Sequence, residues 1–149
     1  MIKVKASGIT ELYAMLQNKA VKVPENARKV MHRTADQIVV EAKINTPRDD
    51  GELEDSIRKK IEYVGRGRLQ INLLVGGFVR GVNVDLYAVI VHENYEGMLK
   101  HGPGPGTLAK MAEYPDHYIG SKFLERAVDK FRPKLAKAMI EGIVREISL

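Results

Sequence analysis

The chain has 149 residues, of which 44% are hydrophobic and 29% charged, as expected for one globular domain. It contains no cysteine, which excludes disulfides and thiolate metal sites. No apolar run is long enough to span a membrane, and the first residues lack the apolar stretch of a secretory signal. The net charge of +5 gathers towards both ends without forming one basic stripe, which favours a solvated surface over a focused nucleic-acid site.

The N-terminal third is predicted to be mainly helical. Residues 1–6 alternate apolar and basic side chains, which is typical of a short edge strand. A short helix capped by its Thr10 is expected over residues 10–16, and Pro24 marks the start of another helix. Across residues 25–45, apolar side chains recur at three- and four-residue steps. This spacing predicts one long amphipathic helix, which Pro47 ends.

A turn and a hairpin are predicted next. Residues 48–51 read Arg-Asp-Asp-Gly, a turn sequence, because aspartates bond nearby N–H groups and glycine permits positive φ. Alternation over residues 59–63 and 68–75, separated by Gly-Arg-Gly at 65–67, predicts two antiparallel strands with one buried face. A further strand, interrupted by glycine, is indicated over residues 79–84.

Residues 85–93 fit either a strand or a helix. The helical interpretation is favoured, with Asp85 as cap and with Leu86, Ile90 and Val91 pointing inward.

The C-terminal half begins with a long irregular stretch, expected over about residues 94–119 and rich in glycine and proline. Within it, residues 107–113 are suited to one or two helical turns. From residue 121 the apolar phase continues across Pro133, which predicts one kinked helix or two nearly continuous ones. Residues 1–149 are therefore expected to form one α+β domain. Two long helices would pack on one face of a small antiparallel β-sheet, with a long Gly/Pro-rich loop.

No catalytic, cofactor or metal site is predicted. The candidate ligands are His92, Glu93, His101, Asp116 and His117, and none has the i,i+4 spacing of a helical zinc motif. The serines lack the Gly-x-Ser-x-Gly context of a nucleophile elbow. Two alternatives stay open: a sequence-nonspecific nucleic-acid-binding protein, based on the basic charge, and a small metal-dependent hydrolase that uses His92, Asp116 or His117.

Four ordered segments carry a family resemblance. They are Gly8-Ile9-Thr10-Glu11-Leu12; Ala42-Lys43 with Pro47, Gly51, Leu53, Ser56 and Ile57; Tyr87-Ala88 with Val91-His92-Glu93; and Phe123-Leu124 with Ala127. In this order and at these distances they resemble the small tail-component family of tailed bacteriophages. The stretch from residue 94 to 120 is longer than in the typical member.

The resemblance implies a non-enzymatic structural protein of the virion, assembled in the bacterial host cytoplasm. The expected role is that of a neck or tail-completion subunit, or a head-side adaptor, that forms a homo-oligomeric ring. Its expected partners are copies of itself, the phage connector or adaptor proteins, the tail tube or tail terminator and passing DNA, but no membrane.

Exposure and charge then suggest which residues would make these contacts. Inter-subunit contacts are expected at Asp49, Asp50, Gly51, Glu52, Leu53, His101, Gly102, Pro103, Gly104 and Pro105. The residues expected to line a DNA channel are Lys130, Arg132, Lys134 and Lys137.

Overall fold

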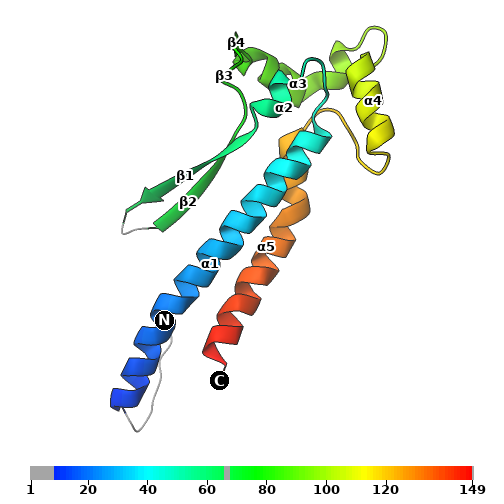
Figure 1. The fold of residues 1–149 in the computed structure, drawn as a ribbon. Coiled ribbons are helices and arrows are strands. Elements are labelled where there is room, and N and C mark those ends of the chain that lie inside the picture. The colour runs from blue at the N-terminus through cyan, green and yellow to red at the C-terminus, as the bar shows by residue number, and fades with distance from the viewer. Residues whose placement is uncertain (1–8, 66–67, 149) are drawn as a thin grey trace.

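A computed structural model describes residues 9–65 and 68–148 of the chain. The strand expected over residues 1–6 lies outside the described residues. The helices are α1 (Ile9–Asn45), α2 (Glu52–Asp55), α3 (Asp85–Met98), α4 (Pro105–Glu113) and α5 (Phe123–Ile147). The strands are β1 (Arg58–Val64), β2 (Arg68–Leu74), β3 (Phe78–Val79) and β4 (Val82–Asn83). The predicted α+β class is confirmed, with helices dominating (Figure 1).

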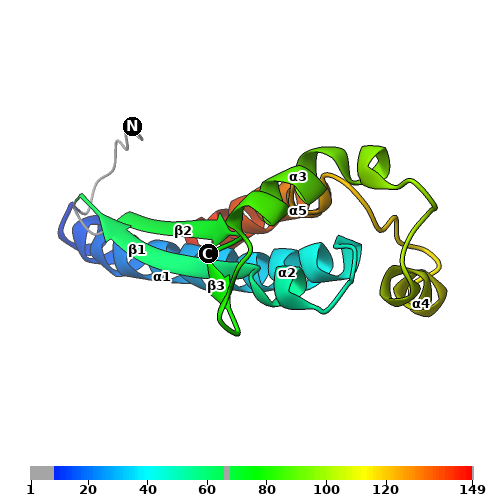
Figure 2. The same ribbon diagram turned by 90° about the horizontal axis from the view of Figure 1, so that it is seen from above.

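The two long helices, α1 and α5, lie side by side and form the shaft of an elongated molecule (Figures 1 and 2). The prediction of a separate helix over residues 10–16 and a boundary at Pro24 was wrong, because α1 continues through this proline. A proline inside a helix removes one backbone hydrogen bond. Packing against α5 offsets that loss, and Asn26 donates a 2.8 Å hydrogen bond to Glu146 on α5.

Helix α5 is likewise one helix across Pro133, so the alternative of two nearly continuous helices was wrong. The proline is exposed, so its ring faces away from the helix pair. Among the described residues, no helix has the length and apolar character required to cross a membrane.

The predicted hairpin is confirmed as β1 paired antiparallel with β2, with Ile61 opposite Ile71. The hairpin lies along α1 (Figure 2). Ile71 and Leu73 on its inner face help line an apolar hollow between β2 and the long helices. Lys59 of β1 pairs with Asp36 of α1 at 2.6 Å. The hairpin is thus fixed to the shaft by apolar contacts and one cross-element ion pair.

The single strand predicted over residues 79–84 was wrong. Two short strands, β3 and β4, pair as a second antiparallel hairpin with Val79 opposite Val82. The residues between them, Arg80 and Gly81, have φ of 48° and 81°. Positive φ at both central residues is the signature of the tight turn that matches strand twist. The glycine therefore reverses the chain where an interrupted strand had been expected.

The irregular stretch expected over residues 94–119 is largely helical. Helix α3 extends to Met98, with a non-helical residue at Asn94, and α4 occupies Pro105–Glu113. Proline is compatible with this helix start, because the first N–H of a helix has no intrahelical partner. Only the segments before and after α4 are irregular. The end of the molecule formed by α2, α3, α4 and the β3–β4 hairpin is called the crown (Figure 1).

The hydrophobic core lies where the shaft meets the crown. Its buried members come from α1, α2, α3, α5 and the residue before β1, and are Ile38, Ala42, Leu53, Ile57, Ala88, Val91, Tyr95, Phe123 and Ala127. Seven of these residues also carry the family resemblance in the sequence. Much of the resemblance therefore lies in residues that pack the elements together.

Candidate interaction site on the crown

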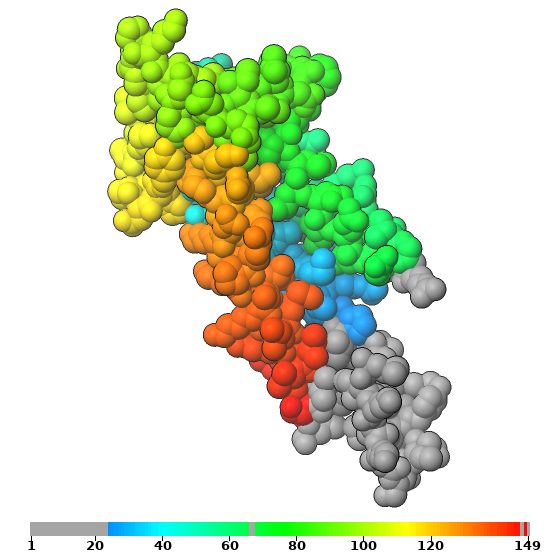
Figure 3. Space-filling model, turned by 180° about the vertical axis from the view of Figure 1, so that it is seen from behind, coloured from blue at the N-terminus to red at the C-terminus, as the bar shows by residue number. Residues whose placement is uncertain are grey.

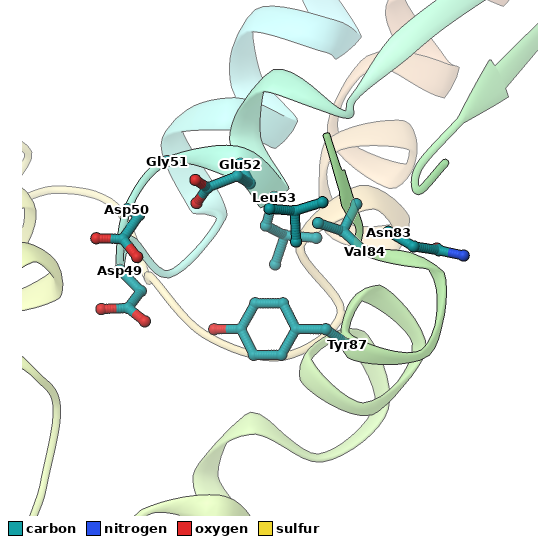
Figure 4. Close-up of a pocket in the computed structure, with 9 residues that line it drawn as sticks. Asp49, Asp50, Gly51, Glu52, Leu53, Asn83, Val84 and Tyr87 are labelled. Carbon is teal, nitrogen blue, oxygen red and sulfur yellow. The ribbon is translucent and has the colours of Figure 1, made fainter. Parts of the chain in front are cut away.

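The five predicted contact residues 49–53 line a surface hollow of about 250 Å³ on the crown. The chain leaves α1 through the buried Pro47, and Gly51 adopts φ of 89° to start α2. Leu53 is buried and forms part of the apolar floor with Val82 and Val84. Tyr87 extends from α3 towards Asp49 and Asp50 on the opposite wall (Figure 4). The hollow therefore joins an acidic rim to an apolar floor.

The rim is negatively charged. Arg80 offsets part of the charge, because its guanidinium lies 3.1 Å from Asp55 and 3.9 Å from Glu52. Within the described part of the chain, the exposed carboxylates of Asp49 and Asp50 have no ion-pair partner. Burial raises the pKa of the Tyr87 phenol, and the nearby negative charges raise it further. The rim is thus electrostatically suited to a cationic partner surface.

Large apolar side chains continue from the hollow along the outside of α3. We call Val82, Leu86, Tyr87, Val89 and Ile90 the crown patch; their exposed fractions are 50%, 73%, 38%, 61% and 39%. The prediction that Leu86 and Ile90 point inward was wrong. Ala88, Val91 and Tyr95 are the buried residues of α3, three and four positions apart. The spacing of these residues was the available signal for the true buried face.

Asp85 does not cap α3 by a side-chain bond, contrary to the prediction, since the N-cap position is Val84. The Asp85 carboxylate instead accepts a 2.6 Å hydrogen bond from the Gly77 backbone N–H. A Cβ at Gly76 would lie 2.5 Å from the same carboxylate. Asp85 therefore ties the start of α3 to the chain that enters the β3–β4 hairpin.

An ionic cluster around the buried Lys110 holds the 46–54 segment in place. Glu54 accepts hydrogen bonds of 2.8 and 3.1 Å from Arg48 and lies 3.0 Å from the Lys110 ammonium. Lys110 is 1% exposed and also donates to the carbonyls of Thr46, at 2.6 Å, and Lys43. It thus satisfies carbonyls at the C-terminal end of α1, which lack helical partners.

Ionisation of the cluster reflects competing effects. Burial lowers the pKa of Lys110, against the opposing influence of Glu54. Burial alone would raise the pKa of Glu54, but hydrogen bonds from Arg48 and Lys110 outweigh it and leave that pKa below its usual value. The carboxylate therefore stays charged at neutral pH. Sequence reasoning missed this cluster, because its members are distant in sequence.

Helix α4 packs directly on the turn that follows α1. The Thr107 hydroxyl accepts a 3.0 Å bond from the Arg48 N–H and donates a 3.0 Å bond to the Arg48 carbonyl. Gly106 allows this approach, since a Cβ there would lie 2.8 Å from the same carbonyl oxygen. The second predicted contact segment, residues 101–105, therefore shares the crown with the first but does not line the hollow.

The four predicted DNA-channel residues lie on α5, and three of them have acidic partners. Lys130 pairs with Glu41 at 2.9 Å, Arg132 with Asp129 at 3.5 Å and Lys137 with Glu141 at 3.9 Å. The Lys134 ammonium lies 5.0 Å from the centre of the Phe131 ring. These contacts reduce the positive field along the helix.

The candidate metal ligands have structural contacts instead of a common centre. His92 lies 2.8 Å from the Glu93 carboxylate and packs edge-on against Phe123. His117 lies 3.4 Å from Glu41. Within residues 9–65 and 68–148, no three histidine or acidic side chains are grouped as a metal site would require.

One family model matches the chain, described as "Bacteriophage HK97-gp10, putative tail-component", over residues 11–91. The match covers more than half of the chain, from α1 into α3, and includes every residue that lines the crown hollow. No curated protein and no solved structure matches the chain. The match agrees with the resemblance seen in the sequence motifs. The chain therefore belongs to the HK97-gp10-like family of bacteriophage tail components.

Proposed function

We propose that this chain is a neck or tail-completion subunit, which forms a homo-oligomeric ring and joins the phage tail to the head connector. Membership of a tail-component family supports a structural role in the virion. The observation that carries the finer proposal is the crown patch. Contiguous exposed apolar side chains beside polar ones mark protein–protein interaction surfaces. A subunit that joins two assemblies is expected to carry such a patch, which its partners bury on binding.

Contacts within the crown hold the crown patch in a fixed position. Val91 and Tyr95 anchor α3 in the core, while the Arg48–Glu54–Lys110 cluster orders the opposite wall of the hollow. A surface ordered before binding loses less conformational entropy when the complex forms. The patch therefore resembles a ready-made docking surface.

Genetic removal with biochemical rescue tests the role. In a phage that encodes this protein, deleting its gene should yield filled heads and complete tails that stay separate. Adding the purified protein to such an extract should restore joined, infectious particles. If no tails form, the protein acts in tail construction. If normal particles form, the protein is not required for joining heads to tails. Either result contradicts the proposal.

A pair of variants links the joining activity to the crown patch. Replacing Leu86 and Val89 with serine removes two strongly exposed apolar side chains without touching the core. This crown variant should fold normally and fail to rescue joining. The matched control is Val40→Ser, because Val40 is 60% exposed on α1 away from the crown. The control should rescue as well as the wild type. Full rescue by the crown variant would exclude this patch from the joint.

A further inference from the structure

We propose that the crown of one copy binds the outward face of α5 on the next copy. The inference rests on the proposed ring and identifies the two surfaces that would form it. The outward face of α5 consists of Pro133, Ala136, Lys137, Ile140 and Val144, which recur at three- and four-residue steps and are all exposed. Figure 3 shows one side of α5, in orange to red, uncovered along the shaft.

The outward face of α5 is apolar at its centre and uncovered. Ile140 is 62% exposed and Val144 is 54% exposed. On the opposite side of the helix, Ala138 and Gly142 line a narrow crevice with residues of α1. Helix α5 therefore buries one side against α1 and leaves a second apolar stripe exposed for a partner. A helix with apolar residues on both sides is expected to be covered on both.

The two surfaces carry opposite charge. Lys134, Lys137 and Arg145 lie beside the apolar stripe of α5, with Glu141 as the acidic residue among them. The crown hollow presents Asp49 and Asp50, whose carboxylates have no ion-pair partner within the described residues. Opposite charge around apolar centres fixes the orientation of two partners and speeds their encounter.

Charge also argues against the alternative of a symmetric crown-to-crown contact. In that arrangement two crowns that both carry the acidic residues Asp49 and Asp50 would face each other. Like charges placed together across an interface weaken association. A crown-to-α5 contact uses two different surfaces of each subunit, and contacts of this kind produce closed rings or open filaments.

Mixing two defective variants tests the pairing directly. The crown variant, Leu86→Ser with Val89→Ser, keeps an intact α5 face. The α5 variant, Ile140→Ser with Val144→Ser, keeps an intact crown. Each alone should self-associate at least about tenfold more weakly than the wild type, a loss of about 1.4 kcal/mol. Mixed together, they should form a one-to-one dimer that grows no further, because one good interface remains.

Sedimentation velocity over roughly a hundredfold range of concentration separates the outcomes. The dimer in the mixture supports crown-to-α5 pairing. A wild type that stays monomeric throughout, an α5 variant that associates normally, or a mixture without dimers overturns it.

A charge exchange provides a second measurement. Asp49→Lys with Asp50→Lys should weaken association, and adding Lys137→Glu with Arg145→Glu to the same chain should restore much of it. Failure of restoration would contradict the proposed pairing.

The head–tail joining assay keeps this inference separate from the proposed function. If the α5 variant rescues joining and the mixture forms no dimer, the crown binds another virion protein. In that case the proposed joining role is supported and the proposed crown-to-α5 contact is contradicted.

Discussion

Lys110 illustrates how one buried cation fixes the crown. Its ammonium contacts Glu54 and two carbonyls at the end of α1, and the side chain is 1% exposed. Lys110→Met should lower the free energy of unfolding by about 1–3 kcal/mol, because the carbonyls of Thr46 and Lys43 lose their buried donor and Glu54 keeps only Arg48 as a partner. Denaturant unfolding measures the change.

The matched control is Lys29→Met, which breaks the exposed pair with Glu25. Exposed pairs contribute no more than about 1 kcal/mol, so this variant should unfold almost like the wild type. Equal losses for the two lysines would show that Lys110 has no special structural role.

Glu96 makes part of the stability depend on pH. It accepts hydrogen bonds from the Tyr118 hydroxyl and, at 3.0 Å, from the Ser121 N–H. Burial opposes ionisation, but these donors lower the pKa of Glu96 from 4.5 to about 2. The folded chain then binds fewer protons than the unfolded chain. Its contribution to stability is therefore complete above pH 4.5 and is lost as the pH falls towards 2.

Glu96→Gln should flatten the dependence of unfolding free energy on pH between these two values and reduce stability at pH 7. Tyr118→Phe removes one donor and should flatten it in part. Urea unfolding at a series of pH values provides the measurement. An unchanged pH profile in Glu96→Gln would rule out this carboxylate as a source of acid sensitivity.

At the scale of elements, α4 depends on one close backbone approach. A Cβ at Gly106 would lie 2.8 Å from the Arg48 carbonyl oxygen, whereas at Gly104 nothing lies within 4 Å. Gly106→Ala should lower the free energy of unfolding by about 1–2 kcal/mol, because the backbone must shift to admit the methyl group. Gly104→Ala is the control and should change it by less than about 0.5 kcal/mol. Equal stabilities would indicate that α4 can move without cost.

The elements differ in how well the sequence predicted them. The hairpin and α5 were predicted because strict alternation and a long apolar stripe are local signals. The start of α1 was misjudged because a proline in a sequence commonly marks a helix boundary, whereas the contacts of α1 with α5, such as the bond from Asn26 to Glu146, join residues 120 positions apart and are not visible locally. The extent of α4 was underestimated, since its support by Arg48 and Glu54 is also non-local.

The candidate site was predicted only in part, for the same reason. Residues 49–53 were singled out from exposure and charge; the structure places them around a hollow, and their contact role stays a prediction. The crown patch was missed because the apolar residues of α3 occupy more than one face, and choosing the buried face requires knowledge of its neighbours. Residues 88, 91 and 95 are three and four positions apart and are buried in the core, whereas Leu86 and Ile90 are exposed.

At the scale of the whole molecule, the charge distribution predicts weak attraction to DNA. The net charge of +5 is spread over the chain, and three of the four α5 cations singled out from the sequence are paired with acids. Binding to free duplex DNA should be no tighter than about 10⁻⁶ M at physiological salt, with a log–log salt slope of about −1 to −2.

Lys134→Gln should make that slope shallower by about one, because this cation lies over a ring and pairs with no acid in the described chain. Fluorescence anisotropy at several salt concentrations measures both quantities. A slope near −5 with tight binding would favour the nucleic-acid-binding alternative over an assembly subunit. Weak, sequence-independent attraction would agree with the proposed ring, since DNA held tightly inside a ring could not pass through it.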